Sequence, residues 1–217
     1  MMLALLASVA LAPAEQTSLL IVRHGETLAN ASGRYNSKTI NTFSEKGNAQ
    51  VARLTKELGN RRFNAIIVSP SERALRTVAP FLKATGQKAT VWPELYECCT
   101  GRNKRMDSNG KIRMGAAFAI PKDIAPLFRI EPGHEKLIVS QTFSDGVMQV
   151  RQGARRLATE FGPNYGSVLI VGHSGAGGVL MEILEGKTTY GKKHPENAVP
   201  YAYELVNSSK FQFRRKS

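Results

Sequence analysis

Two arginines and two histidines follow short apolar runs in this sequence, and together they could bind an anion. They are Arg23, His24, Arg73 and His173. Unbroken apolar runs are typical of the buried strands of a parallel sheet, and such strands deliver their last residues to the edge where α/β proteins bind ligands. Arginine offers paired planar donors that suit phosphate oxygens, and neutral imidazole is a nucleophile near neutral pH. The residue types therefore predict a phosphate pocket.

The elements that must position these residues alternate between strands and helices. Buried strands are predicted at residues 19–22, 65–68, 89–92 and 168–171. Apolar residues at helical spacing predict helices at 45–58, from about Ser71 onward, at 145–161 and at 175–185. Pro80 should bend or break the second of these helices. Residues 28–42 are polar and predict a long loop, while 202–206 and 211–213 predict edge strands. This alternation favours an α/β layer fold.

Composition limits the class of protein and of partner. Apolar residues make up 42% of the 217 residues, which predicts a globular domain rather than a disordered chain. Lys and Arg number 30 against 17 Asp and Glu, so the formal net charge is +13. Such a surplus attracts nucleic acid, anionic membranes or phosphorylated small molecules, and it does not choose among them.

The first fourteen residues have the pattern of a cleavable signal peptide. Residues 1–14 carry no charged side chain, residues 3–11 are apolar, and Ala12-Pro13-Ala14 forms an A-x-A cleavage pattern. The absence of Lys or Arg from this segment departs from the usual pattern, and an apolar helix or lipid-facing anchor is the alternative. We expect a single mature domain at 15–217 that is secreted or periplasmic, with a cytoplasmic location as the alternative.

The segment at residues 100–135 lacks a clean period and predicts an insertion over the edge of the sheet. Its cluster of cations comprises Arg102, Lys104, Arg105, Lys111 and Arg113. This cluster could form a basic lid over an anionic substrate, or it could be a solvated loop. Just before it, Cys98 and Cys99 are adjacent, so they give neither a disulfide framework nor a zinc pattern.

Several motifs now point to one family. Arg23-His24-Gly25-Glu26-Thr27 resembles the signature of the histidine phosphatase superfamily, in its phosphoglycerate mutase-like branch. Residues 43–50 are similar to the start of a helix in that branch, and the segment from Ser69 through Arg73 to Thr77 matches a further motif. Gly172-His173-Ser174 matches the second histidine. The resemblance runs from residue 19 to 206 and leaves out residues 100–135.

The resemblance implies a three-layer α/β/α sandwich with a mainly parallel central sheet and a phosphohistidine mechanism. His24 would attack phosphorus, while Arg23, Arg73 and His173 would bind the phosphoryl oxygens. Asn30 and Ser174 would be further substrate contacts. Fixed cationic side chains would replace a metal ion, so neither a metal nor another cofactor is expected.

The resemblance also requires a proton donor for the leaving oxygen, which later activates water. Glu97 fits, because Leu95-Tyr96-Glu97 reproduces the family's context for that acid. The sequence departs just after it, where residues 98–101 replace the expected aromatic-glycine stretch. Glu94 and Asp107 remain possible substitutes.

We therefore expect an exported phosphomonoesterase that acts on phosphorylated, possibly polyanionic, small molecules and not on nucleic acid. A phosphoglycerate mutase would use the same pocket and is the alternative within the enzymes. A non-catalytic protein that binds polyanions on the same scaffold is the alternative of a different class.

Overall fold

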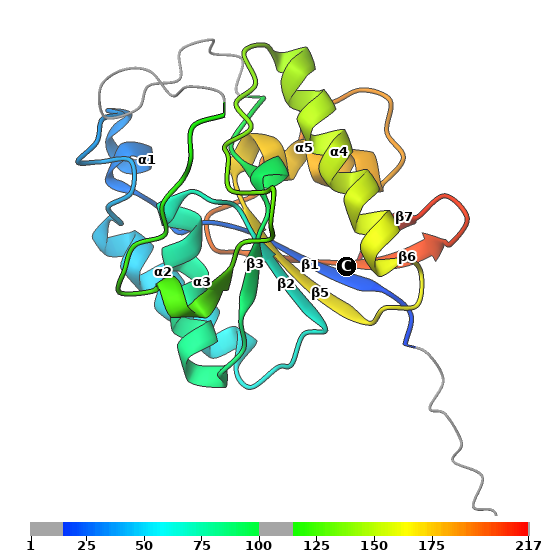
Figure 1. Cartoon of the computed structure of the whole chain (residues 1–217), viewed down its shortest axis with the longest axis horizontal. Coiled ribbons are helices and arrows are strands. Elements are labelled where there is room, and N and C mark those ends of the chain that lie inside the picture. The colour runs from blue at the N-terminus through cyan, green and yellow to red at the C-terminus, as the bar shows by residue number, and fades with distance from the viewer. Residues whose placement is uncertain (1–14, 100–114, 217) are drawn as a thin grey trace, which may run out of the picture.

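A seven-stranded sheet forms the centre of the computed structural model, which describes residues 15–99 and 115–216. The strand order is β4-β3-β2-β5-β1-β6-β7 (Figure 1). Strands β1 to β5 run parallel, and β6 is antiparallel to both of its neighbours. Their bounds are Ser18–Arg23 (β1), Ala65–Val68 (β2), Ala89–Val91 (β3), Phe128–Arg129 (β4), Ser167–Gly172 (β5), Pro200–Asn207 (β6) and Gln212–Arg215 (β7).

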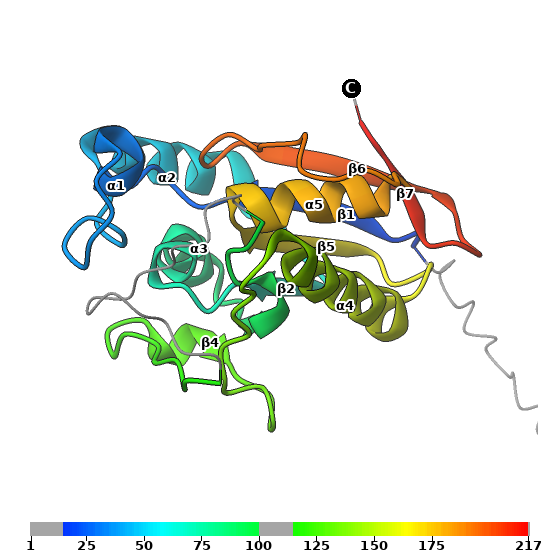
Figure 2. The same cartoon turned by 90° about the horizontal axis from the view of Figure 1, so that it is seen from above.

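Helices cover both faces of this sheet (Figure 2). On one face, α2 (Glu45–Leu58) and α3 (Glu72–Thr85) pack on apolar residues that include Leu20, Val22 and Leu169. On the other, α4 (Phe143–Phe161) and α5 (Ser174–Leu184) pack on residues that include Leu19 and Ile170. Alternate residues of one strand thus supply two cores. This three-layer arrangement confirms the predicted fold class.

Most predicted elements occur where the sequence places them. The helix at 45–58 coincides with α2, whose N-cap Ser44 accepts a hydrogen bond from the Gly47 amide at 2.9 Å. Ser71 occupies the N-cap position of α3, although its side chain makes no capping hydrogen bond.

Two predictions about elements are wrong, and the break predicted at Pro80 is not seen in the described helix. The segment at 28–42 begins with a short helix, α1 (Leu28–Ser32), because Thr27 and Asn30 form a capping box. Helix α3 continues through Pro80 instead of breaking there, and Pro80 is exposed. Strand β6 is internal rather than at an edge, since it pairs with both β1 and β7.

The predicted insertion is only partly described. Residues 115–135 contain a short 3₁₀ helix, Ala125–Leu127, and then β4, which forms one edge of the sheet beside β3. This part of the segment therefore joins the sheet instead of only lying over it. The five predicted lid cations and the predicted signal peptide at 1–14 lie outside the described residues. Among the described helices, none is long and apolar enough to cross a membrane.

Candidate active site

The strand order brings the predicted phosphate pocket together at one edge of the sheet. Strand β5 lies between β1 and β2, so the ends of all three strands are neighbours. The amide of His24 donates to the Gly172 carbonyl at 3.0 Å, just before His173, and the amide of Ser69 donates to the Val171 carbonyl at 2.9 Å. The carboxyl ends of parallel strands are where ligands bind in open α/β sheets.

His24 is buried and its ring orientation is fixed by the backbone. The residue is only 3% exposed to solvent. Its Nδ1 atom is 2.7 Å from the Gly25 carbonyl oxygen. Because a carbonyl can only accept, Nδ1 carries the proton in this hydrogen bond. The lone pair is therefore on Nε2, which accepts from Arg73 Nε at 3.2 Å.

Arg73 joins the two histidines. Its Nη2 lies 3.3 Å from His173 Nδ1, while its Nε donates to His24. The two imidazole rings meet edge to face with their centroids 5.2 Å apart. On its other side, His173 Nε2 is 2.7 Å from Ser69 Oγ. We call Arg23, His24, Arg73 and His173 the phosphate pocket.

Burial and charge act together on the ionisation of this pocket. Burial, and then the positive charge of Arg73, hold the pKa of His24 well below its ordinary value. Burial also lowers the pKa of Arg73, and the nearby Glu97 carboxylate opposes that shift. An arginine remains protonated at physiological pH. The pocket therefore combines a neutral imidazole with fixed positive charge.

Arg23 contributes a free donor to the same edge. One of its terminal nitrogens donates to the Pro195 carbonyl at 3.2 Å. Its Nε is buried and has no hydrogen-bond partner among the described residues. A buried donor without a partner is costly, and a bound anion would satisfy it.

Glu97 reaches the pocket through the first turn of α5. Its Oε1 accepts from the amides of Gly175 and Ala176, both at 3.2 Å, and from its neighbour Cys98 at 3.1 Å. Its Oε2 is 4.0 Å from His173 Nδ1. One oxygen is thus held by backbone donors, and the other faces the pocket.

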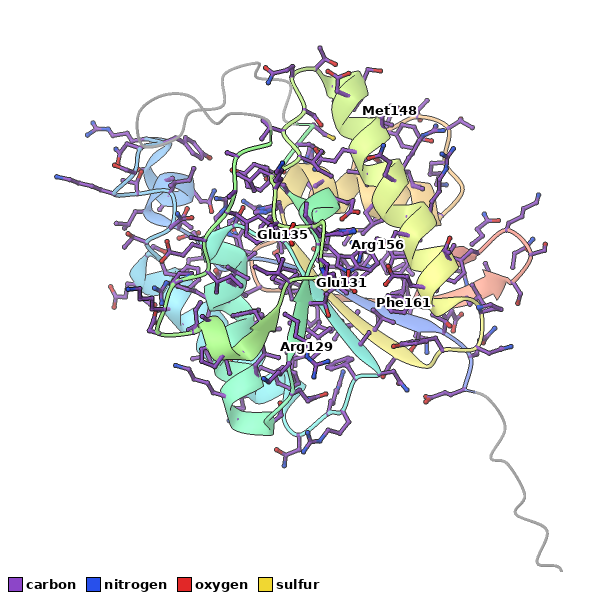
Figure 3. All side chains as sticks on the ribbon, viewed as in Figure 1. Arg129, Glu131, Glu135, Met148, Arg156 and Phe161 are labelled. Carbon is purple, nitrogen blue, oxygen red and sulfur yellow. The ribbon has the colours of Figure 1, made fainter. Side chains whose placement is uncertain are left out.

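The alternative acids are placed differently. Glu94 is buried against Arg156, with 3.3 Å between Oε2 and a terminal nitrogen. Arg156 also pairs with Glu131, which is labelled near it in Figure 3, and with Glu160. Glu94 therefore belongs to an ion-pair cluster on α4 that ties down the segment around 131. Asp107 lies outside the described residues.

The two predicted substrate contacts have different surroundings. Asn30 Oδ1 accepts from the amide and the hydroxyl of Thr27, both at 3.1 Å, so this oxygen caps α1. Ser174 is the first residue of α5 and directly follows His173. Their contact with substrate stays a prediction. Cys98 and Cys99 are buried beside α4, and the structure shows no disulfide at either of them.

The structure adds a loop that sequence reasoning missed. Asn197 Nδ2 donates to the His24 carbonyl at 2.8 Å, and the amide of Ala198 donates to the Arg23 carbonyl at 2.9 Å. The start of this loop is held by Glu182, a buried carboxylate that accepts from the amides of residues 191, 192 and 193. No local pattern marks this loop, because its role depends on a contact across some 170 residues.

The sequence of this chain is similar to those of known phosphatases. A model of the histidine phosphatase superfamily (branch 1) matches residues 19–198. An adenosylcobalamin/alpha-ribazole phosphatase of Salmonella typhimurium is 35% identical over 83 residues, which are 38% of this chain and 41% of that protein. The match thus spans about two fifths of the length of this curated relative.

Solved structures share the fold over nearly the whole chain. A putative alpha-ribazole-5'-P phosphatase from Escherichia coli has a TM-score of 0.64 at 19% identity, covering 92% of this chain and 95% of that one. A mycobacterial glucosyl-3-phosphoglycerate phosphatase has a TM-score of 0.61 at 20% identity, covering 92% and 96%. At these identities the likeness concerns the fold.

Proposed function

Because the chain belongs to the histidine phosphatase superfamily (branch 1), we propose that it hydrolyses phosphate monoesters through a phosphohistidine intermediate. One observation carries the proposal: the Nε2 lone pair of a neutral, buried His24 faces Arg73, and Arg73 also contacts His173. This places a nucleophile beside fixed donors for the phosphoryl oxygens.

In the first step, His24 Nε2 attacks phosphorus. The N–P bond forms while the P–O bond to the leaving group breaks, and Arg23, Arg73 and His173 hold the charge that spreads over the phosphoryl oxygens. Glu97 is the proposed general acid that gives a proton to the leaving oxygen. The alcohol then departs.

In the second step, Glu97 removes a proton from water, and the water oxygen attacks phosphorus. The N–P bond breaks, phosphate is released, and His24 returns to its neutral form with the proton still on Nδ1. The hydrogen bond from Nδ1 to the Gly25 carbonyl keeps the ring in one orientation through both steps.

Substitution of His24 tests the intermediate. With a 32P-labelled phosphomonoester, wild type should give an acid-labile, alkali-stable labelled protein, and His24→Ala should give neither label nor turnover. His194→Ala is the matched control, because His194 is exposed and lies outside the pocket. A His24→Ala variant that keeps the label would overturn the proposed nucleophile.

The same pocket could serve a mutase, so the assay should measure both outcomes. We expect phosphate release without conversion of 3- to 2-phosphoglycerate. Conversion without net release would contradict the phosphatase proposal. An inactive wild type that still binds polyanions would favour the non-catalytic alternative.

For the substrate, we propose a phosphorylated small molecule. The names of the similar proteins supply the first panel: alpha-ribazole phosphate and glucosyl-3-phosphoglycerate, beside simple phosphomonoesters. A kcat/KM at least tenfold higher for one of them would identify the class of substrate. Equal values across the panel would mean that the loops do not select the leaving group.

We also propose export, supported by the uncharged apolar segment at residues 1–14. The full chain, expressed in bacteria and fractionated, should appear outside the cytoplasm with Glu15 as its first residue. Recovery in the cytoplasm with Met1 still present would contradict export.

A further inference from the structure

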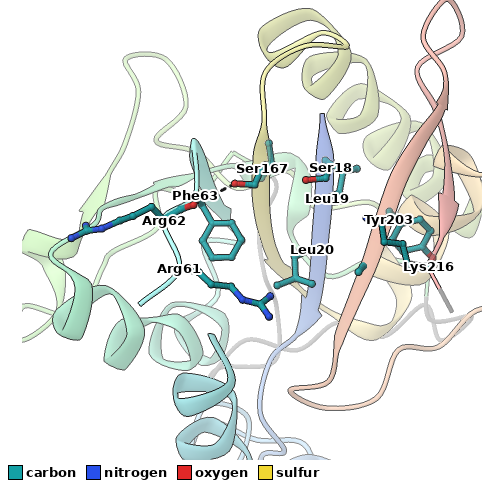
Figure 4. A pocket seen from close by; sticks show the side chains of 11 residues that line it. Ser18, Leu19, Leu20, Arg61, Arg62, Phe63, Ser167, Tyr203 and Lys216 are labelled. Atoms are coloured by element: carbon teal, nitrogen blue, oxygen red, sulfur yellow. Dashed lines mark hydrogen bonds between the residues drawn. The ribbon is translucent and has the colours of Figure 1, made fainter. Parts of the chain in front are cut away.

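A cavity lies at the end of the sheet opposite the phosphate pocket. Its volume is about 290 Å³, and it is lined by the first residues of β1 and β5, including Ser18 and Ser167 (Figure 4). The phosphate pocket begins at Arg23, at the other end of β1. Five residue steps along a strand separate the two by roughly 16 Å.

The floor of this cavity is apolar. Leu20 and Ala202 face it from paired positions on β1 and β6, and Phe63 lines it from the segment before β2. Helix α2 ends at Leu58, so this part of the sheet face lies beyond the end of that helix. A recessed apolar floor suits the hydrocarbon part of a ligand rather than a hydrated ion.

The rim of the cavity is positively charged. Of the described residues that line it, three are cationic and none is acidic. Arg62 donates to the Thr85 carbonyl at 2.6 Å and points away in Figure 4. The side chain of Lys216 is 53% exposed, and its Nζ atom is 3.8 Å from Glu204 Oε2.

Arg61 is the cation that the fold leaves uncommitted. Its side chain extends toward Leu20 in Figure 4, over the apolar floor. Its guanidinium makes no hydrogen bond or ion pair with any residue that the structure describes. A free guanidinium offers two parallel donors to a carboxylate or a phosphate.

We propose that this cavity binds a small amphipathic anion. The apolar body lies on Leu20, Ala202 and Phe63, and the carboxylate, sulfonate or phosphate pairs with Arg61 and Lys216. The volume of about 290 Å³ lies just below the range of roughly 300 to 1,000 Å³ for ligand pockets, so the part of the ligand inside the cavity is small. The site is separate from the proposed phosphatase centre and does not depend on it.

Fluorescence titration of the full chain with 1-anilinonaphthalene-8-sulfonate tests the site. Arg61→Gln should weaken binding about tenfold, because it removes the bidentate partner. Arg53→Gln is the matched control, since Arg53 is an exposed arginine on α2 outside the cavity, and it should stay within twofold of wild type. Ala202→Phe should abolish binding by filling the floor without changing the charge.

Activity measurements separate this proposal from the proposed function. All three variants should hydrolyse p-nitrophenyl phosphate with unchanged kcat/KM, and orthovanadate should not displace the probe. Equal probe affinity in wild type and Arg61→Gln would overturn the proposal, as would displacement by orthovanadate. Displacement of the probe by an RNA oligonucleotide should also be measured. If Arg53→Gln and Arg61→Gln weakened that displacement equally, the probe would be bound by a broad basic surface, and the proposed cavity site would be wrong.

Discussion

The hydrogen bond from His24 Nδ1 to the Gly25 carbonyl decides which ring nitrogen can attack phosphorus. A carbonyl supplies no proton, so Nδ1 must, and Nε2 keeps its lone pair. The donor opposite Nε2 is Arg73, a group that also binds phosphate well. At the scale of single residues, tautomer and charge thus favour the same reacting atom.

The lowered pKa of His24 predicts activity in acid. Imidazolium is not a nucleophile, so kcat/KM should fall only when the pH drops through the pKa of His24 in the free enzyme. Burial and Arg73 hold that pKa well below 6.5, so the acid limb of the profile should lie below pH 6.5. A pH profile of kcat/KM with p-nitrophenyl phosphate measures it. A midpoint at or above 6.5 would contradict this account.

The fork of Arg73 predicts that lysine cannot replace it. Arg73 reaches both histidines through different nitrogens, Nε and Nη2, whereas lysine has a single ammonium group. Arg73→Lys should lower kcat by about 10²- to 10³-fold, as the loss of one donor to a transition-state charge does elsewhere. Arg53→Lys, on the exposed side of α2, should leave kcat unchanged. Comparable kcat values for the two variants would refute the bridging role.

At the scale of elements, helix α5 fixes the loop that supports the pocket. A Cβ on Gly178 would lie 1.8 Å from the Lys193 carbonyl oxygen, so the loop packs directly on the helix backbone. The loop cannot retreat easily, because the Lys193 amide donates to the buried Glu182 carboxylate at 2.9 Å. Four residues later, Asn197 reaches His24.

This packing predicts opposite effects for two adjacent glycines. Gly178→Ala should lower the free energy of unfolding by about 1–3 kcal/mol through overpacking, and it should reduce turnover by displacing the loop. Gly177→Ala is the control, because its Cβ would meet only Pro195 at 3.6 Å. Alanine in a helix should then stabilise the protein by about 0.5–1 kcal/mol. Urea unfolding measures the stability of both variants. Equal unfolding midpoints would contradict the close packing of the loop on α5 at Gly178.

Local sequence was enough for the elements that carry the pocket. Apolar runs and a Ser44 cap predict β1, β2, β5 and α2 almost to the residue, because burial and capping act within short stretches. The order of β2, β5 and β1 then places the two histidines together. The family motifs name the same residues.

What the sequence could not predict depends on contacts between distant segments. Strand β4 has two residues and exists through pairing with β3, and Asn197 acts across the whole domain. The sequence context predicts Glu97 as the acid. Its hydrogen bonds with the amides of α5 could not be predicted, because they depend on how α5 packs against the segment that carries Glu97. Pro80 lies inside α3 at an exposed position, and the exposure of a helix position depends on tertiary packing that a local rule does not include.

At the scale of the whole molecule, one strand links two places with different chemistry. Strand β1 begins at the apolar, basic-rimmed cavity and ends at the phosphate pocket. Both attract anions, and the formal net charge of +13 adds a field that extends beyond either. Binding of an anion at one end therefore has to be distinguished from attraction to the whole surface.

Salt dependence makes that distinction for the substrate. A net positive protein steers multiply charged anions toward itself, and salt shortens the range of this field from about 30 Å at 0.01 M to about 10 Å at 0.1 M. The kcat/KM for a phosphomonoester with extra anionic groups should therefore fall about tenfold over this range. A phosphomonoester with a neutral tail should lose much less, because the phosphate pocket itself is buried and poorly screened. If kcat/KM fell equally with salt for the two substrates, the net charge of the protein would not be what selects between them.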